Sequence, residues 1–300
     1  MILFGGKGGV GKTTCAASTG LYLAINRKTL IFSTDPAHSL SDSLGQRVGD
    51  EVMRVNGVEN LSALEISAEK VLSEFKMEYE DELRKLFDTS TYLDKEDIDS
   101  ILALPIPGID EVMGFKTILD LTEEGKFDKY IVDTAPTGHA LRLLTLPELL
   151  DDWIKVMAKM RWKYRYMVAC FSGKNNPDSA DDFLMRMKRT VKRIDCLLRD
   201  EKRCEFIVVT IPEDMAIKET ERMIKSLNQY RMKIKQIIIN NVIPEHVNCR
   251  FCQARKEDHH KYIREIRNKF SDLKITELPL QPHEVKGLEA LKNLGSILLK

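Results

Sequence analysis

The chain has 300 residues, of which 46 are basic and 46 are acidic, so its formal net charge at pH 7 is zero. A chain with no net charge is not expected to be a general binder of polyanions such as nucleic acid. No run approaches the roughly 18 consecutive apolar residues that a membrane-spanning helix needs. Six cysteines are too few for a disulfide scaffold in a chain of this length. We therefore expect a cytoplasmic protein with reduced thiols that contacts a membrane at most peripherally.

Short apolar segments rich in β-branched residues alternate with helical patterns along the chain. This alternation predicts an α/β fold with a doubly wound, mostly parallel sheet and helices on both faces. The central segments are continuously apolar, as strands buried on both faces require. The predicted strands are Met1–Phe4, Thr29–Ser33, Leu61–Ile66, Lys129–Asp133, Glu205–Thr210, Lys235–Asn240 and Thr276–Leu278.

The middle of the chain has a mainly helical pattern. We expect a nucleotide-binding core made of residues 1–67, 125–145 and 204–300. An inserted all-helical subdomain is expected at about residues 68–124 and 146–203.

Two apolar stripes at three- and four-residue spacing predict amphipathic helices in this subdomain. Methionine is concentrated here, since seven of the twelve lie between Met77 and Met187. Such stripes either pack in a core or, because methionine adapts to varied apolar ligands, line a groove. The first stripe comprises Leu150, Trp153, Met157, Met160, Tyr164 and Met167, and the second comprises Phe183, Met187, Val191, Ile194 and Leu198.

A phosphate-binding loop follows the first predicted strand. Residues 6–13 match the pattern G-x-x-x-x-G-K-[ST] completely and open an apolar helix. The glycines let backbone N–H groups converge on phosphate oxygens. Lys12 would reach the β- and γ-phosphates of ATP, and Thr13 would ligate Mg²⁺. The predicted nucleotide-binding residues are Gly6, Lys7, Gly8, Gly9, Val10, Gly11, Lys12, Thr13 and Thr14.

Two aspartates lie at the carboxyl ends of predicted strands, where ligands of open α/β sheets bind. Asp35 follows the second strand and could orient the attacking water or accept its proton. Asp133 ends the strand Lys129–Asp133 and could hold the Mg²⁺ shell. An aspartate in this position is often only a helix cap, but two of them beside a complete phosphate loop favour ATP hydrolysis.

Cys249 and Cys252 form a C-x-x-C pair, which supplies two of the four ligands that Zn²⁺ prefers. Two copies in a homodimer would complete a Cys₄ site on the two-fold axis. Alternatively, one chain closes the site with His246, or with His259 and His260. A redox pair and two incidental cysteines are the other interpretations.

Four segments resemble the family of the arsenical pump-driving ATPase and the tail-anchored-protein targeting ATPase, which are P-loop proteins with a deviant Walker A motif. The segments are Gly5–Thr14, Thr34–Asp42, Asp133–Leu144 and Asn240–Arg255. The resemblance extends over nearly the whole chain. It implies a symmetric homodimer that closes on ATP and Mg²⁺ and opens after hydrolysis.

The resemblance also implies roles for single residues. Lys7 matches the lysine that reaches across the dimer to the partner's nucleotide, and Asp35 matches the water-activating acid. Asp133 matches the acid of the second switch. Asn240 matches the adenine-reading asparagine, whose amide suits the donor and acceptor edge of that base. Pro279 would form one wall of the adenine site.

The targeting branch of this family carries the cysteine pair, so the resemblance favours zinc shared by two chains. In that branch the helical subdomains would form a groove for the transmembrane helix of a tail-anchored client, with delivery to a possible membrane receptor. The expected groove residues are Met113, Trp153, Met157, Met160, Met167, Met187 and Val191.

Two other functions stay open at this point. The chain could be the ATPase subunit of an arsenite efflux pump, although those proteins fuse two ATPase halves and this chain has one phosphate loop. It could also be a partitioning or division-site ATPase, in which the helical subdomain and the cysteine pair would have no use.

Overall fold

The computed structural model describes residues 1–34, 39–88, 109–134, 151–152, 154–159, 162, 179–245 and 249–299. The chain divides into two compact units. Unit 1 consists of Met1–Ser67, Asp120–Leu144 and Leu197–Lys300, and unit 2 consists of Ala68–Leu119 and Thr145–Cys196.

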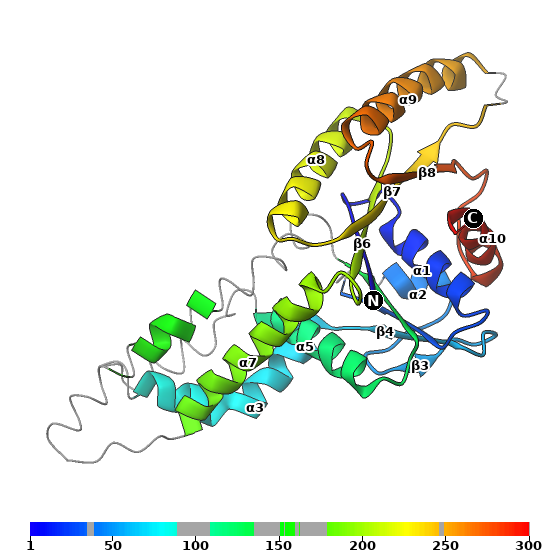
Figure 1. The fold of residues 1–300 in the computed structure, drawn as a ribbon. Coiled ribbons are helices and arrows are strands. Elements are labelled where there is room, and N and C mark those ends of the chain that lie inside the picture. Colours follow the sequence, from blue (N-terminus) through cyan, green and yellow to red (C-terminus); the bar gives the residue numbers. More distant parts are fainter. Residues whose placement is uncertain are drawn as a thin grey trace, which may run out of the picture. The chain divides into compact units, whose positions relative to one another are not determined.

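Within the described residues, unit 1 contains an eight-stranded sheet in the order β3-β4-β2-β5-β1-β6-β7-β8 (Figure 1). All neighbouring strands pair in parallel except β3 and β4, which are antiparallel. The strands are β1 (Ile2–Gly5), β2 (Thr29–Ser33), β3 (Met53–Arg54), β4 (Leu61–Glu65), β5 (Lys129–Asp133), β6 (Glu205–Thr210), β7 (Ile234–Val242) and β8 (Lys274–Pro279).

The sequence-based prediction of this sheet is confirmed for seven strands, with ends that differ by three residues or fewer. The edge strand β3 was not predicted. It has only two residues, and both are exposed, so it lacks the apolar run that marks a buried strand. The central strands are buried on both faces, as their continuous apolar sequences predict.

Helices cover both faces of the sheet. Ile2, Phe4 and Ile31 share a core cluster with residues of α1 and α10, and Leu3, which alternates to the opposite face of β1, is buried as well. α8 and α9 lie on the other side of the sheet from α1 and α10 (Figure 1). Among the described residues, the helices that belong wholly to unit 1 are α1 (Lys12–Leu23), α2 (Ser39–Leu44), α8 (Asp214–Gln229), α9 (Arg250–Lys269) and α10 (Leu288–Leu298). This arrangement is an α/β P-loop fold.

Unit 2 is helical in its described part. It includes α3 (Ala68–Asp88) and most of α5 (Ile109–Glu124) and α7 (Ser179–Arg199). The predicted second stripe is confirmed as one buried face of α7, with Phe183, Met187, Val191, Ile194 and Leu198 all buried.

An aromatic cluster joins two of these helices. The ring centroid of Tyr79 in α3 lies 5.1 Å from that of Phe75 and 5.0 Å from that of Phe183 in α7. Phe75 and Phe183 are completely buried, so the two helices form a packed core in this unit. None of the described helices is long and apolar enough to span a membrane.

Candidate active site

The loop between β1 and α1 has a backbone that depends on glycine. The φ angle is 77° at Gly9 and 92° at Gly11, in the region that L-residues rarely adopt. A Cβ atom at Gly6 would lie 2.1 Å from the carbonyl oxygen of Val209, and one at Gly11 would lie 2.4 Å from Nδ2 of Asn240. The loop is therefore packed tightly against the ends of β6 and β7, and it leads into the N-terminus of α1, which favours bound anions.

The lysine of the loop motif, Lys12, is held inside the loop. Lys12 has a relative exposure of 5%, and its Nζ donates to the carbonyl oxygen of Lys7 at 3.1 Å. A γ-phosphate offers this ammonium group a stronger, charge-assisted hydrogen bond than a peptide carbonyl does. Lys12 is thus already inside the phosphate loop, where its ammonium group could bind a phosphate oxygen in place of the Lys7 carbonyl oxygen.

Hydroxyl and carboxylate oxygens meet at the start of α1. Thr13 Oγ1 donates to Asp133 Oδ2 at 2.7 Å, and Ser39 Oγ lies 3.0 Å from Thr13 Oγ1. Ser33 Oγ donates to the same oxygen of Asp133 at 3.3 Å. Asp133 is completely buried. These are the oxygen ligands that Mg²⁺ prefers, so the residues present fit the cation that a P-loop site employs.

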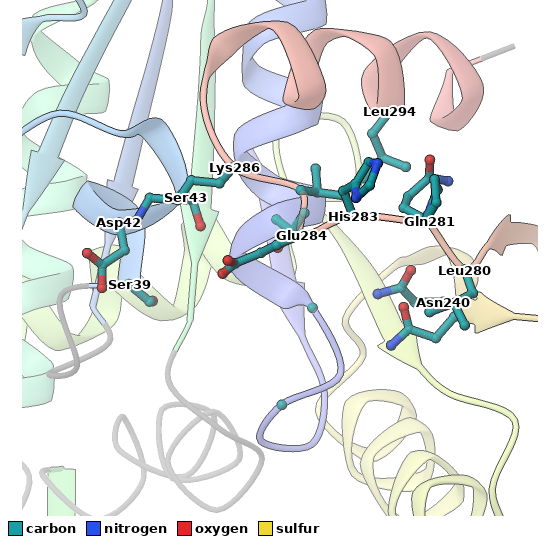
Figure 2. A pocket seen from close by; sticks show the side chains of 16 residues that line it. Ser39, Asp42, Ser43, Asn240, Leu280, Gln281, His283, Glu284, Lys286 and Leu294 are labelled. Carbon is teal, nitrogen blue, oxygen red and sulfur yellow. The ribbon is translucent and has the colours of Figure 1, made fainter.

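A cavity of about 550 Å³ opens beside the loop, within the usual range of about 300–1,000 Å³ for small-molecule sites. Figure 2 shows Ser39, Asp42 and Ser43 of α2 on one side of it and Asn240 and Leu280 on the other. The segment 281–286 lies between them. The cavity therefore extends from the phosphate loop to the carboxyl ends of β7 and β8.

Asn240 is oriented by the phosphate loop. Its Nδ2 donates to the carbonyl oxygen of Val10 at 2.9 Å. An amide nitrogen has two hydrogens, so the second N–H and the carbonyl oxygen Oδ1 can still pair with an adenine edge. The contact places the predicted base-reading residue at the cavity and ties it to the loop.

The segment after β8 differs in detail from the expectation for Pro279. Among the described residues, Leu280 rather than Pro279 lines the cavity, and the carbonyl oxygen of Pro279 accepts from Gln281 Nε2 at 2.8 Å. Further along, the N–H of Gly287 donates to the carbonyl oxygen of Ser43 at 2.9 Å. This hydrogen bond links the segment to α2.

The two cysteines of the C-x-x-C pair lie at the start of α9. Cys249 is the N-cap residue, and its Sγ accepts from the backbone N–H of Cys252 at 3.1 Å. A side-chain hydrogen bond from Cys252 is the main cause that lowers the pKa of Cys249, and the same bond raises the pKa of Cys252. Cys249 is exposed and Cys252 is half-buried, so the pair could contribute thiolate ligands at the surface.

His259 is less suited to complete a zinc site within one chain. It has a relative exposure of 4%, and its Nδ1 accepts from the backbone N–H of Ile243 at 3.3 Å. Burial lowers its pKa. Within the described ranges, no group of three or more His, Cys, Asp or Glu residues is arranged to hold a metal ion.

Several residues singled out from the sequence cannot be placed. Asp35 and His246 lie outside the described residues, and so do the groove candidates Trp153, Met160 and Met167.

The other groove candidates are placed within unit 2. Met157 is half-buried, and Met113, Met187 and Val191 have relative exposures of 6%, 3% and 6%. The last three side chains are therefore buried in this structure.

Sequence reasoning missed one buried charged residue near the site. Glu65 ends β4 and has a relative exposure of only 3%. A carboxylate at the end of an apolar strand is a visible signal, because a buried charge needs several hydrogen bonds.

Known proteins resemble the chain along its whole length. Residues 1–300 match the profile of the family described as anion-transporting ATPase. A protein of Paramecium tetraurelia named "ATPase ASNA1 homolog 1" is 34% identical over 100% of this chain and 92% of its own. "ATPase get3" of Pyrenophora tritici-repentis is 34% identical over 100% and 91%, and "ATPase GET3B" of Arabidopsis thaliana is 35% identical over 99% and 78%.

Proposed function

The chain belongs to the anion-transporting ATPase family, and we propose that it works as a homodimer that uses ATP to capture, shield and deliver tail-anchored membrane proteins. The ATPase activity follows from the family and from relatives named as ATPases. The observation that carries the proposal is the contact of Thr13 with Asp133 beside a nucleotide-sized cavity, in a chain that matches those relatives over its full length.

The phosphate end of the site supplies binding and orientation. Backbone N–H groups of residues 8–13 hold the β-phosphate, and Lys12 exchanges the Lys7 carbonyl oxygen for phosphate oxygens. Thr13 and Asp133 would hold Mg²⁺, which when bound would offset the negative charge of the phosphates. Asp35 orients the attacking water and takes its proton.

Two chains acting together complete this chemistry. Lys7 of each protomer reaches the nucleotide of the other, where its charge offsets the negative charge that develops during phosphoryl transfer. Cys249 and Cys252 of both protomers hold one Zn²⁺ on the two-fold axis, which suits a pair of adjacent surface thiols. Asn240 reads adenine, with Leu280 and Pro279 beside the base.

The helical subdomain, at about residues 68–124 and 146–203, binds the client. A transmembrane helix of about 20 apolar residues must be covered in water. The seven groove residues named from the sequence supply the apolar surface. Because Met113, Met187 and Val191 are buried in unit 2, forming the groove requires the helices to part, which dimer closure on ATP would drive.

The place of action follows from the client. A targeting factor of this kind works in the cytoplasm and releases its cargo at a membrane receptor, and its own membrane contact is peripheral. Neither step calls for nucleic acid. The alternative is the ATPase subunit of an arsenite efflux pump, which is disfavoured by relatives named GET3 or ASNA1.

Co-expression with a client tests the proposal. The protein is purified without detergent together with a protein that ends in one C-terminal transmembrane helix, and the mass of the complex is measured by light scattering. We expect a soluble complex of fixed stoichiometry. A client whose terminal helix carries two central aspartates is the matched control and should not be retained. An empty dimer, together with arsenite-stimulated ATP hydrolysis, would favour the pump.

A further inference from the structure

Glu65 directs both oxygens of its buried carboxylate to the first turn of α2. Oε1 accepts from the backbone N–H groups of Leu40 and Ser41, each at 3.0 Å, and Oε2 accepts from Ser41 Oγ at 2.6 Å. The backbone N–H of Glu65 also donates to the carbonyl oxygen of Gly49 at 2.9 Å. A carboxylate with this many donors is held firmly, because hydrogen bonds to a charged group are the strong ones.

The same turn of α2 contacts the magnesium ligands. Ser39, the residue before Leu40, begins α2, and its Oγ lies 3.0 Å from Thr13 Oγ1. Thr13 has one hydroxyl hydrogen, which it donates to Asp133 Oδ2 at 2.7 Å. Ser39 must therefore be the donor to Thr13. Because Thr13 accepts from Ser39 and donates to Asp133, its hydroxyl is held in one orientation.

α2 depends on outside contacts for its position. It has six residues, and helices of this length are not stable through their own hydrogen bonds. Glu65 is anchored in the sheet, since β4 pairs with β2 along its full length. The carboxylate therefore fixes the position of the first turn of α2, and with it Ser39, relative to the sheet.

We propose that Glu65 is a positioning residue for the magnesium centre, acting through α2 and the Ser39 hydroxyl on Thr13. The inference rests on the proposed magnesium role of Thr13 and Asp133. It adds a residue that is not itself proposed as a metal ligand and yet determines how tightly Mg²⁺–nucleotide is bound relative to nucleotide alone.

A graded series of substitutions separates this role from simple burial. Glu65→Ala leaves the donors on Leu40 and Ser41 without these acceptors. Glu65→Asp keeps the charge, but its side chain is one methylene shorter, so the carboxylate lies farther from Leu40 and Ser41. Glu65→Gln keeps Oε1, and its amide can donate to Ser41 Oγ, whose hydrogen can turn to the Val48 carbonyl oxygen 3.4 Å away. Glutamine should therefore rescue the function.

The measurement is the Kd of a non-hydrolysed ATP analogue, obtained by calorimetry in excess Mg²⁺ and again in EDTA. The ratio of the two values is the magnesium gain. We expect Glu65→Ala to reduce this gain on the order of tenfold, as loss of hydrogen bonds to a charged group implies, while the Kd in EDTA stays within about twofold of the original. Glu65→Asp should give an intermediate loss, and Glu65→Gln should stay within about twofold.

Ser39→Ala provides the second arm. If Glu65 acts through Ser39, the double variant should lose no more magnesium gain than Ser39→Ala alone. Equal losses in Mg²⁺ and EDTA, an unchanged gain in Glu65→Ala, or additive losses would each overturn the proposal. If Glu65→Ala unfolds in circular dichroism, Glu65→Asp replaces it in the same comparison.

Thr13→Ala distinguishes failure of this inference from failure of the proposed function. If Thr13→Ala retains the magnesium gain, the magnesium site itself is misassigned. If Thr13→Ala abolishes the gain and Glu65→Ala retains it, the magnesium site stands and only the role of Glu65 is refuted.

Discussion

Replacing Gly11 by alanine tests how closely the phosphate loop and Asn240 are packed. The new Cβ atom would lie 2.4 Å from Asn240 Nδ2, and the backbone φ of 92° is unfavourable for alanine. Nδ2 is the end of a side chain and can move. Moving it breaks the 2.9 Å hydrogen bond to the Val10 carbonyl oxygen.

The expected cost has two parts. The left-handed backbone costs alanine about 1–2 kcal/mol, and the lost hydrogen bond costs about 1 kcal/mol. We therefore expect Gly11→Ala to lower the free energy of unfolding by about 2–3 kcal/mol. Gly9→Ala is the matched control, because its φ is 77° and no atom lies within 4 Å of its Cβ position. It should cost only the backbone part, about 1–2 kcal/mol.

The assay is urea unfolding of the nucleotide-free protein, followed by far-ultraviolet circular dichroism. Combining Gly11→Ala with Asn240→Ala completes a double-mutant cycle, in which the obstacle to the new methyl group is removed. We expect Gly11→Ala to cost no more than Gly9→Ala in that background, which gives a coupling of about 1 kcal/mol. Equal costs of Gly11→Ala with and without Asn240 would refute the reasoning.

Three further predictions concern helix packing, thiol chemistry and hydrolysis. A Cβ at Gly295 of α10 would lie 2.4 Å from a carbonyl oxygen of α1, so Gly295→Ala should lower the free energy of unfolding by about 1–3 kcal/mol. Gly114→Ala in α5, where nothing lies within 4 Å, should be neutral or stabilising by up to about 1 kcal/mol, and equal melting shifts for the two variants would contradict the packing. The hydrogen bond from Cys252 lowers the pKa of Cys249, so its alkylation by iodoacetamide, followed by mass spectrometry, should reach its midpoint at a lower pH than that of an ordinary cysteine thiol. Burial raises the pKa of Cys15 to about 12, so that thiol should react only on unfolding, and the order of labelling would be reversed if the assignment were wrong. Asp35→Asn should reduce steady-state ATP turnover at least about 100-fold with unchanged nucleotide affinity, and near-normal turnover would remove Asp35 from the mechanism.

The fold could be predicted well because burial leaves a strong mark on sequence. Strands such as Lys129–Asp133 have a continuously apolar centre, and that pattern is sufficient to locate them in a parallel sheet. β3 shows the limit of this approach. Its two residues are exposed, and they form a strand because they pair with β4, not because of an apolar pattern of their own. Periodicity identified α7, but it could not decide whether Met187 faces a core or a ligand.

The candidate site was predictable where a motif fixes the residues, as at Lys12 and Thr13. The contacts between distant segments were not predictable. No local pattern indicates that Asn240 donates to Val10, which is 230 positions away in sequence, because that bond follows from how the carboxyl ends of β1 and β7 lie at one edge of the sheet. The partners of Glu65 were not predictable for the same reason, since α2 brings them to its carboxylate.

The central claim is that ATP hydrolysis governs release of a covered transmembrane helix. The most direct measurement loads the protein with a tail-anchored client carrying a fluorophore beside its helix and follows transfer to liposomes. We predict that Mg²⁺–ATP causes transfer, that a non-hydrolysed analogue does not, and that Asp35→Asn, which binds ATP but hydrolyses it slowly, retains the client in both cases. Transfer at the same rate without nucleotide, or from the Asp35→Asn protein, would contradict the account.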